Sequence, residues 1–448
     1  MRLRIYLVYA IKYIYNNNSL RIQADIYILS IQKSFPQNKI DNPNKMKQQT
    51  VIPFLALLLV LVSCNTPAEQ TKVITLDNIA AQLRLLDENV IKVQAEAPLT
   101  ANGQKRVVPR TINKDGSLSV VPIGDWTSGF YPGTLWYMFE LTGEEEWKEK
   151  AIKYTAELEE EQFNTRDHDV GFRMFCSYGN ALRLTADDSY IPVLVQSGRS
   201  LITRYYENVG CLRSWNFNQE NWQCPVIVDN MMNLELLFWA SNQTGDPVFY
   251  DIAFSHALTT MENHFRPDFS SIHVVDYDTI TGDVRHRNTH QGYADESAWA
   301  RGQSWGLYGY TVTYRLTDHI DFLKQAENIA NFLLGHPNLP EDLVPYWDFD
   351  APGIPDEERD VSAAAIMASA LYELCLYSEK GAYYKAKADK IMESLGTTYA
   401  SAPGENYGFI LDHSVGAKPL GSEVDVPLNY ADYYYLEALL RKKNLEAQ

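Results

Sequence analysis

The sequence predicts an all-α fold, an (α/α)6 barrel of six helical hairpins, and two features of its patterning favour that class. From about residue 75 the apolar side chains recur at the i, i+3 and i+4 spacing of amphipathic helices, as in segment 319–335. Convincing strand alternation is nearly absent, and His273-Val274-Val275 is the best short strand candidate. An open solenoid of hairpins is the alternative, but no 34-residue repeat is visible, which favours the closed barrel.

Twelve helices are expected in chain order, enough for an inner and an outer ring of six. Gly335 stands where the C-terminal cap of one helix belongs, and the pair Asp246-Pro247 is typical of a helix start. The expected ranges are 78–97, 129–142, 146–163, 173–184, 190–206, 229–243, 246–265, 300–315, 319–335, 361–377, 380–397 and 430–443.

The segment before these helices has the pattern of an export signal. A charged start at residues 46–50 precedes the apolar run 51–62, and a small residue stands before Cys64. The run is too short for a membrane-spanning helix, which needs about 20 apolar residues. Leu61-Val62-Ser63-Cys64 also resembles a bacterial lipobox, in which the cysteine becomes the lipidated N-terminus. A buried N-terminal helix is the alternative interpretation.

The chain is therefore expected to divide into four parts. Residues 1–45 are interpreted as upstream sequence translated ahead of the true start, residues 46–63 as a lipoprotein signal peptide, and residues 64–75 as a tether. Residues 76–448 are expected to form a single catalytic domain. The expected location is that of an exported lipoprotein in the bacterial periplasm or outer membrane, with a membrane anchor on Cys64.

Composition and charge exclude several classes of partner and cofactor. The formal net charge is −18, and residues 1–63 carry six more basic than acidic residues, so the rest has a net charge of −24. Such an acidic domain is a poor nucleic-acid binder, because phosphate contacts need clusters of Lys and Arg. Walker, Rossmann and GxSxG motifs are missing, and no cofactor is expected. Neither a disulfide framework nor a zinc site is expected, because the remaining cysteines form no CxxC pair; they are Cys176, Cys211, Cys224 and Cys375.

Two aspartates are candidates for acid–base chemistry. Asp169 lies in Asp167-His168-Asp169 just ahead of an expected helix, and close carboxylates shift each other's pKa values. Asp229 follows an apolar run and opens a strongly apolar helix, so burial should raise the pKa of its carboxyl, which suits a general acid. The alternative role of both residues is helix N-capping, which aspartate performs routinely.

Aromatic and polar side chains gather in two other segments. Trp126 lies in a Gly- and Pro-rich loop, where it could form the floor of a sugar site or simply belong to a helix entry. In segment 286–305, Trp299, Arg301 and Trp305 could line one wall of a pocket, and arginine can hold a carboxylate in bidentate fashion. Two histidines near two aspartates could instead indicate a metal, but their spacing matches no standard ligand pattern, so no metal is expected. Paired carboxylates in an aromatic cleft are the usual machinery of glycoside cleavage.

At these segments the sequence resembles the unsaturated glucuronyl hydrolases, glycoside hydrolase family 88. The resemblance covers essentially all of residues 120–443 and is carried by six long motifs. They are DWTSGFYPG at 125–133, HDVGF at 168–172, VDNMMNLELLFWAS at 228–241, THQGYADESAWARGQSWGLYG at 289–309, RDVSAAAIMASALYEL at 359–374 and SEVDVPLNYADYYYLEAL at 422–439. The family's fold is an (α/α)6 barrel, which agrees with the helices expected above.

The resemblance implies a glycosidase that removes a 4,5-unsaturated uronic acid from the non-reducing end of lyase-generated oligosaccharides, with glycosaminoglycan fragments as the expected source. The family hydrates the C4=C5 double bond instead of attacking the anomeric carbon. Its acid/base aspartate matches Asp229, which would protonate C4, and its second essential aspartate matches Asp169, whose carboxylate would stabilise positive charge at C5. Such a pair needs environments that push the two pKa values apart.

The resemblance also suggests which side chains line the substrate. Trp215 matches an aromatic residue that stacks on the next sugar, Arg301 is the candidate for the uronate carboxylate, and His168 is expected to support Asp169. The remaining matches are Trp126, His273, Gln291, Trp299 and Trp305.

Two alternatives to this function stay open. One is an unsaturated rhamnogalacturonyl hydrolase acting on pectin fragments, and the other is a helical glycan-binding lipoprotein without catalysis. The motifs at 289–309 and 422–439 argue against the first, and the paired aspartates argue against the second.

Overall fold

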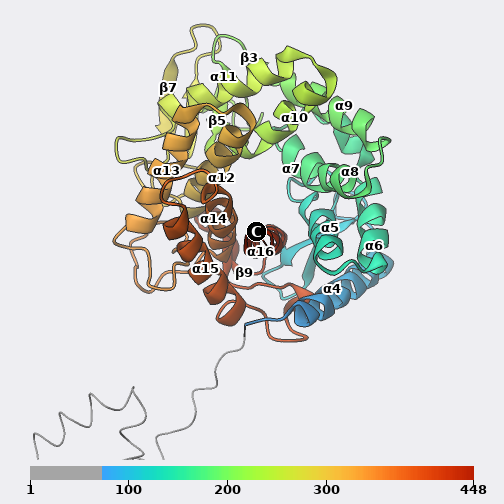
Figure 1. Ribbon diagram of the computed structural model, residues 1–448. Helices are drawn as coiled ribbons and strands as arrows, with labels where there is room; N and C mark the ends of the chain where they lie inside the picture. Colours follow the sequence, from blue (N-terminus) through green and yellow to red (C-terminus); the bar gives the residue numbers. More distant parts are fainter. Residues whose placement is uncertain (1–72, 448) are drawn as a thin grey trace, which may run out of the picture. The chain divides into compact units, whose positions relative to one another are not determined.

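The computed structural model describes residues 73–447, and this part of the chain is built mainly of helices (Figure 1). Its α-helices are α4 (Leu76–Glu96), α5 (Phe130–Thr142), α6 (Glu145–Ala156), α7 (Val170–Met174), α8 (Asn180–Thr185), α9 (Tyr190–Ile202), α10 (Leu234–Thr244), α11 (Pro247–Asn263), α12 (Ala300–Thr317), α13 (Ile320–Gly335), α14 (Val361–Leu374), α15 (Gly381–Thr397) and α16 (Asn429–Glu446). Short helical turns are η1 (Glu159–Phe163), η2 (Phe175–Gly179), η3 (Val228–Asn233), η4 (Asn406–Gly408) and η5 (Lys418–Leu420).

Each of the twelve expected helices is present, and most of their ends agree within a few residues. Three expected helices are not continuous α-helices, and one of them, 146–163, corresponds to α6 followed by the 3-10 turn η1. The range 173–184 corresponds to α7 and α8 joined by the π-helical turn η2, and the range 229–243 begins with the 3-10 turn η3 before α10. The turn η3 contains Asp229, and η2 begins one helical turn after the segment that carries Asp169, so regular helix geometry gives way close to both candidate aspartates.

The helices differ in how completely they are buried, and this difference separates inner from outer positions. Every residue of α14 is buried, and half of them are alanine or serine, whose small side chains let neighbouring helices approach. In α13 the buried residues instead lie on one face, at Phe322, Ala326, Ile329 and Leu333. The inner helices are α5, α7, α8, α10, α12, α14 and α16, and the others cover them from outside (Figure 1).

Neighbouring inner helices pack against one another. Helix α16 contacts both α14 and α5, α14 contacts α12, α12 contacts α10, α10 contacts α7, and α8 contacts α5. Helices α5 and α16 approach closely because of Gly133 in α5. A Cβ added there would lie 2.4 Å from the ring of Tyr433 in α16. Five pairs among the described helices follow one another as hairpins, from α5–α6 to α14–α15, with α4 before them and α16 after them.

Four small antiparallel sheets in the described residues were not expected from the sequence. They contain β1 (Val108–Ile112) with β2 (Leu118–Val121), β3 (Tyr205–Tyr206) with β4 (Cys211–Leu212), β5 (Pro225–Ile227) with β6 (Val274–Tyr277) and β7 (Val284–Asn288), and β8 (Ser414–Ala417) with β9 (Ser422–Val426). Strands β6 and β8 are buried along their whole length, so they lack the alternation that reveals a half-buried strand. The best short candidate from the sequence, residues 273–275, overlaps β6.

The two helix-end predictions had different outcomes. Asp246 caps α11 by accepting a hydrogen bond from the amide of Val248, as predicted. The prediction for Gly335 was wrong, because this glycine is the last helical residue and the cap is His336 in an extended conformation. The predicted signal peptide, Cys64 and nearly all of the tether lie outside the described residues. No helix among residues 73–447 is long and apolar enough to cross a membrane.

Candidate active site

A cavity of about 260 Å³ lies where the N-terminal ends of the inner helices meet the β8–β9 hairpin. Seven of the ten residues predicted for the site line it: Trp126, His168, Asp169, Trp215, Asp229, Gln291 and Arg301. The other three, His273, Trp299 and Trp305, are almost fully buried and form no part of the surface of this cavity. The structure therefore brings together two candidate carboxyls that are 60 residues apart in sequence.

Asp229 is held by η3, directly after strand β5. Because Ile227 pairs with Val274 across the sheet, Asp229 and His273 lie at the same end of the two strands, with His273 Nε2 3.8 Å from Asp229 Oδ2. Asp229 is 8% exposed and makes no ion pair with an arginine or lysine of the described residues. Burial raises the pKa of its carboxyl to about 7, and the charge of Arg301 offsets this only in part. The raised pKa agrees with the prediction.

His273 presents one defined tautomer to Asp229. Its Nδ1 accepts hydrogen bonds from the backbone amides of His290 (3.1 Å) and Gln291 (3.2 Å), so the ring hydrogen is on Nε2. Burial, together with neighbouring positive groups, lowers the pKa of His273 well below its usual value, so the ring is neutral. Trp299 packs against it with ring centroids 4.5 Å apart and fixes its orientation. The neutral ring can donate from Nε2 to the Asp229 carboxylate.

Asp169 immediately precedes α7, but its side chain does not cap that helix. One carboxyl oxygen lies 3.3 Å from Nε2 of His168, consistent with the predicted supporting role of that histidine. Burial and the charges of Asp167 and Asp229 raise the pKa of Asp169 well above its usual value. Burial thus shifts the pKa values of Asp169 and Asp229 in the same direction, upward. The expected separation of the two values stays a prediction.

Asp167 differs sharply from Asp169, although it is only two residues away. Although burial opposes ionisation, the guanidinium of Arg173 lowers the pKa of Asp167 through close ion-pair hydrogen bonds of 2.8 Å. Arg173 is 1% exposed and also donates to the backbone carbonyls of Asp125 and Gly124. One buried arginine therefore fastens the loop of Trp126 to the loop of Asp169. Arg173 was not among the residues predicted from the sequence. The one available signal was its position four residues after Asp169, within the same helical turn.

Arg301 does not present the free bidentate fork that was predicted for a uronate carboxylate. Its terminal nitrogens donate to Asp360 and to the backbone carbonyls of Val415 and Gly416, so only Nε has no partner among the described residues. The guanidinium also lies 4.4 Å from the ring centroid of Trp299. Arg301 thus holds strand β8 against the starts of α12 and α14, and that role was not visible in the sequence.

Aromatic side chains form one rim of the cavity. Trp215 and Phe217 stack with centroids 4.8 Å apart and an interplanar angle of 13°, and Trp222 and His290 pack around them. Phe217 is 49% exposed, so part of this rim faces solvent. Across the cavity, Trp126 packs on Tyr430 at 5.1 Å. Lining residues that the sequence reading missed include Arg110, Phe172, Phe217, His290, Glu423 and Tyr430.

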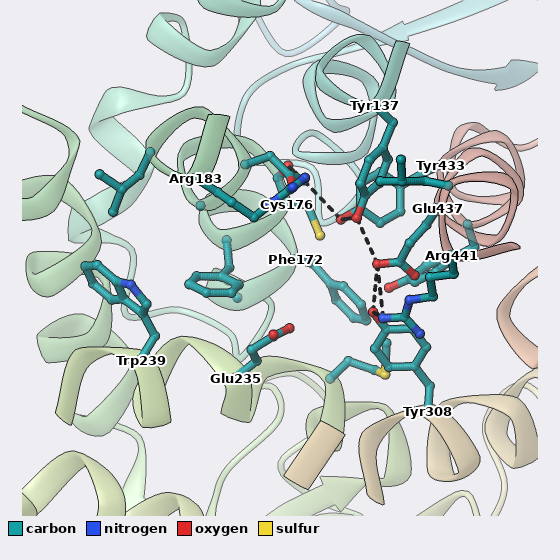
Figure 2. Close-up of a pocket in the computed structure, with 18 of the residues that line it drawn as sticks. Tyr137, Phe172, Cys176, Arg183, Glu235, Trp239, Tyr308, Tyr433, Glu437 and Arg441 are labelled. Atoms are coloured by element: carbon teal, nitrogen blue, oxygen red, sulfur yellow. Dashed lines mark hydrogen bonds and ion pairs between the residues drawn. The ribbon is translucent and has the colours of Figure 1, made fainter. Parts of the chain in front are cut away.

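A larger cavity of about 550 Å³ lies on the other side of Phe172, among the later turns of the inner helices (Figure 2). Its charged groups are engaged with one another. Glu437 accepts from Tyr137 and Tyr308, and Glu235 pairs with Arg315. In the smaller cavity, by contrast, the carboxyls of Asp169 and Asp229 have no lysine or arginine partner among residues 73–447. The smaller cavity is therefore the candidate active site.

Comparison with known proteins shows the family of this chain. The profile described as Glycosyl Hydrolase Family 88 matches residues 104–440. The chain belongs to glycoside hydrolase family 88. It is 45% identical over 396 residues to an unsaturated glucuronyl hydrolase of Formosa agariphila, which covers 87% of this chain and 97% of that protein.

Two solved structures show how far the likeness to family 88 proteins extends. An unsaturated glucuronyl hydrolase specific for heparin is 46% identical, with a TM-score of 0.75 and coverage of 82% of this chain and 98% of that one. A structure solved with dGlcA-Glc-Rha-Glc is 30% identical, with a TM-score of 0.74 and coverage of 82% and 96%. The mostly helical fold of the described residues is therefore the fold of family 88 enzymes.

Proposed function

We propose that the enzyme removes a 4,5-unsaturated uronic acid from the non-reducing end of glycosaminoglycan fragments by hydrating the C4=C5 double bond. Its activity is that of an unsaturated glucuronyl hydrolase. The observation that carries the proposed chemistry is the buried carboxyl of Asp229, whose pKa of about 7 keeps a proton available near neutral pH. Similarity to a heparin-specific relative favours sulfated glycosaminoglycan fragments as the substrate class.

In the proposed reaction, Asp229 donates its proton to C4 of the unsaturated ring. The ring oxygen makes the double bond electron-rich, so protonation builds oxocarbenium-like charge at C5. Water then adds there and passes a proton to the carboxylate of Asp229, which regenerates the acid. The new hydroxyl at C5 makes the ring unstable, and it opens with loss of the glycosidic link. The Nε2–H of His273 and the charge of Arg301 stabilise the Asp229 carboxylate left behind.

Asp169 is proposed as the second carboxyl of the reaction. Positive charge that develops at C5 favours its ionised form, in opposition to the burial that raises its pKa in the empty cavity. The ionised carboxylate would stabilise the charge at C5 and orient the attacking water. The neutral ring of His168 and the Asp167–Arg173 pair hold it in place.

The decisive experiment follows the ultraviolet absorbance of the conjugated double bond in a panel of lyase-generated disaccharides. Heparin, chondroitin, hyaluronan, alginate, gellan and pectin products would be compared at equal concentration. The proposal expects loss of absorbance with glycosaminoglycan disaccharides, and Asp229→Asn should abolish that loss while retaining substrate binding. Turnover of pectin products alone would instead favour a rhamnogalacturonyl hydrolase, and unchanged absorbance throughout would contradict hydration.

For the fold, we propose that the inner and outer helices close into an (α/α)6 barrel. The packing of α16 against α5 supports closure, because these are the last and the first of the inner helices in chain order. The hydrogen bond between the hydroxyls of Tyr137 and Tyr433 joins the same two helices at 3.2 Å. A closed ring explains how one cavity collects residues from every part of the chain.

For the cell, we propose an exported lipoprotein in the periplasm or outer membrane, anchored through Cys64. The apolar run 51–62 and the lipobox-like sequence ending at Cys64 support this proposal. Expression of the full chain with labelled fatty acid should place label on the protein in the membrane fraction. Cys64→Ser should lose both label and membrane association, and an unlabelled wild-type protein would contradict the anchor.

A further inference from the structure

A carboxylate of the protein itself occupies one wall of the active-site cavity. Glu423, on strand β9, binds the guanidinium of Arg110 in bidentate fashion, with Nε–Oε1 and Nη2–Oε2 distances of 2.5 and 2.8 Å. The remaining terminal nitrogen of Arg110 donates to Asp125 at 2.7 Å. Both Arg110 and Glu423 line the cavity, with side-chain exposures of 20% and 10%. This is the geometry in which arginine recognises carboxylates and other oxyanions.

The chain makes room for this carboxylate at a particular point. An added Cβ at Gly416 would lie 2.4 Å from Oε2 of Glu423, so a larger residue on β8 would expel the carboxylate. Glu423 itself adopts a left-handed backbone with φ of 54°, which is unfavourable for a residue other than glycine. Two local features are therefore arranged so that the Glu423 side chain can reach Arg110.

Other groups that favour an anion surround the same position. Burial acts against the charge of Arg110, but Asp125 and Glu423 raise its pKa well above the usual value. The charge of Glu423 also acts on Arg301, and on Tyr430, whose hydroxyl has no partner among the described residues. Two guanidinium groups, a phenol and the Glu423 carboxylate thus line the same cavity.

Arg110 and Arg301 differ in whether the side chain of their carboxylate partner has room to move away. Arg301 is held by two backbone carbonyls and by Asp360, which is fully buried and also caps α14. Glu423 lies on the β9 strand of a hairpin whose turn is exposed, and it also borders an adjoining open cavity lined by Ser422 and Lys114. Its side chain can therefore swing out of the active site, whereas Asp360 cannot.

We infer that Arg110 binds an oxyanion of the substrate in exchange for the carboxylate of Glu423. The inference rests on the proposed function, because it assumes an anionic sugar in this cavity. The oxyanion is the carboxylate of the unsaturated uronate or a sulfate ester on the bound sugars. Substrate binding exchanges one bidentate oxyanion for another on Arg110. An anionic group of the substrate must therefore bind Arg110 more favourably than the Glu423 carboxylate does.

The test compares Glu423→Gln and Arg110→Gln with the wild type, using unsaturated disaccharides of one linkage with and without sulfate. Glu423→Gln should lower KM by about tenfold and Arg110→Gln should raise it by about tenfold, the effect of one charge-assisted contact, with smaller changes in kcat. Equal shifts for both substrates assign Arg110 to the carboxylate, and shifts confined to the sulfated substrate assign it to the sulfate. KM values within twofold of the wild type for both variants and both substrates would overturn the inference.

A second readout does not depend on turnover. Inorganic sulfate should raise the melting temperature of Glu423→Gln more than that of the wild type, and adding Arg110→Gln to that variant should remove the gain. Asp425→Asn is the matched control, because Asp425 has a similar backbone on the same strand but is 53% exposed and pairs with His413. A wild type without turnover would refute the proposed function alone, whereas an equal response to sulfate in all variants would refute the anion site.

Discussion

The raised pKa of Asp229 should cost stability, and Asp229→Asn measures that cost. The unfolded chain loses this proton near pH 3.8, whereas the folded enzyme keeps it to about pH 7. Between these values unfolding releases a proton, so stability falls as the pH rises through the interval. At 1.36 kcal/mol per pKa unit the loss above pH 7 amounts to about 4 kcal/mol. Because asparagine cannot ionise, the variant should escape this loss.

Urea unfolding at pH 4.5 and pH 8 would measure the free energy of unfolding of the wild type and the variant. Asp229→Asn should be about as stable as the wild type at pH 4.5 and more stable at pH 8, by up to about 4 kcal/mol. This figure is an upper bound, since a buried amide also loses hydration. The variant should have no measurable turnover at either pH.

The control is Asp425→Asn, which removes an exposed carboxyl and should change stability little at either pH. The reasoning fails if Asp229→Asn is less stable than the wild type by the same amount at both pH values. That outcome would mean that the folded enzyme stabilises the ionised Asp229 carboxylate, which would then be unsuited to donate a proton at neutral pH.

Three further outcomes follow from the same structure. The kcat/KM profile should fall about tenfold per pH unit above pH 7 as Asp229 ionises, and a flat profile from pH 6 to pH 9 would assign the proton to another group. Arg173→Gln should lower the unfolding free energy by about 1–3 kcal/mol, because it leaves the half-buried Asp167 carboxylate without its partner; an unchanged urea midpoint would exclude that role. Phe217→Ala should raise KM severalfold with kcat unchanged, because the exposed ring continues the Trp215 stack along the rim, and equal KM values would remove it from the substrate path.

The helices and the placement of the two aspartates could be predicted because they follow from local patterns. Apolar side chains at helical spacing identified each expected helix, and the apolar run before Asp229 was sufficient to predict its burial and raised pKa. The short strands were missed because their pairing joins distant segments and because β6 and β8 are buried on both faces.

The partners of the charged groups could not be predicted, because they are set by contacts across the whole chain. Arg110 and Glu423 are separated by 313 positions, and nothing near either residue indicates the other. Arg301 looked available for a carboxylate because its sequence neighbours are aromatic, yet its terminal nitrogens are taken by residues from α14 and β8. The pKa of Asp169 depends in the same way on Asp229, whose distance from it only the fold defines.

These contacts also explain how a strongly acidic protein can hold an anionic sugar. With a formal net charge of −18, the long-range field opposes a sulfated or uronate-bearing substrate. Helices α7, α12 and α16 begin beside the active-site cavity, at Phe172, Arg301 and Tyr430, so the partly positive backbone amides of their first turns lie on the cavity side. Arg110 and Arg301 lie among these helix starts, and the strongest attraction is therefore confined to the first few ångströms. Such a site selects an anionic group by its fit after contact, because an anion must displace Glu423 from the half-buried guanidinium of Arg110 before it can bind there.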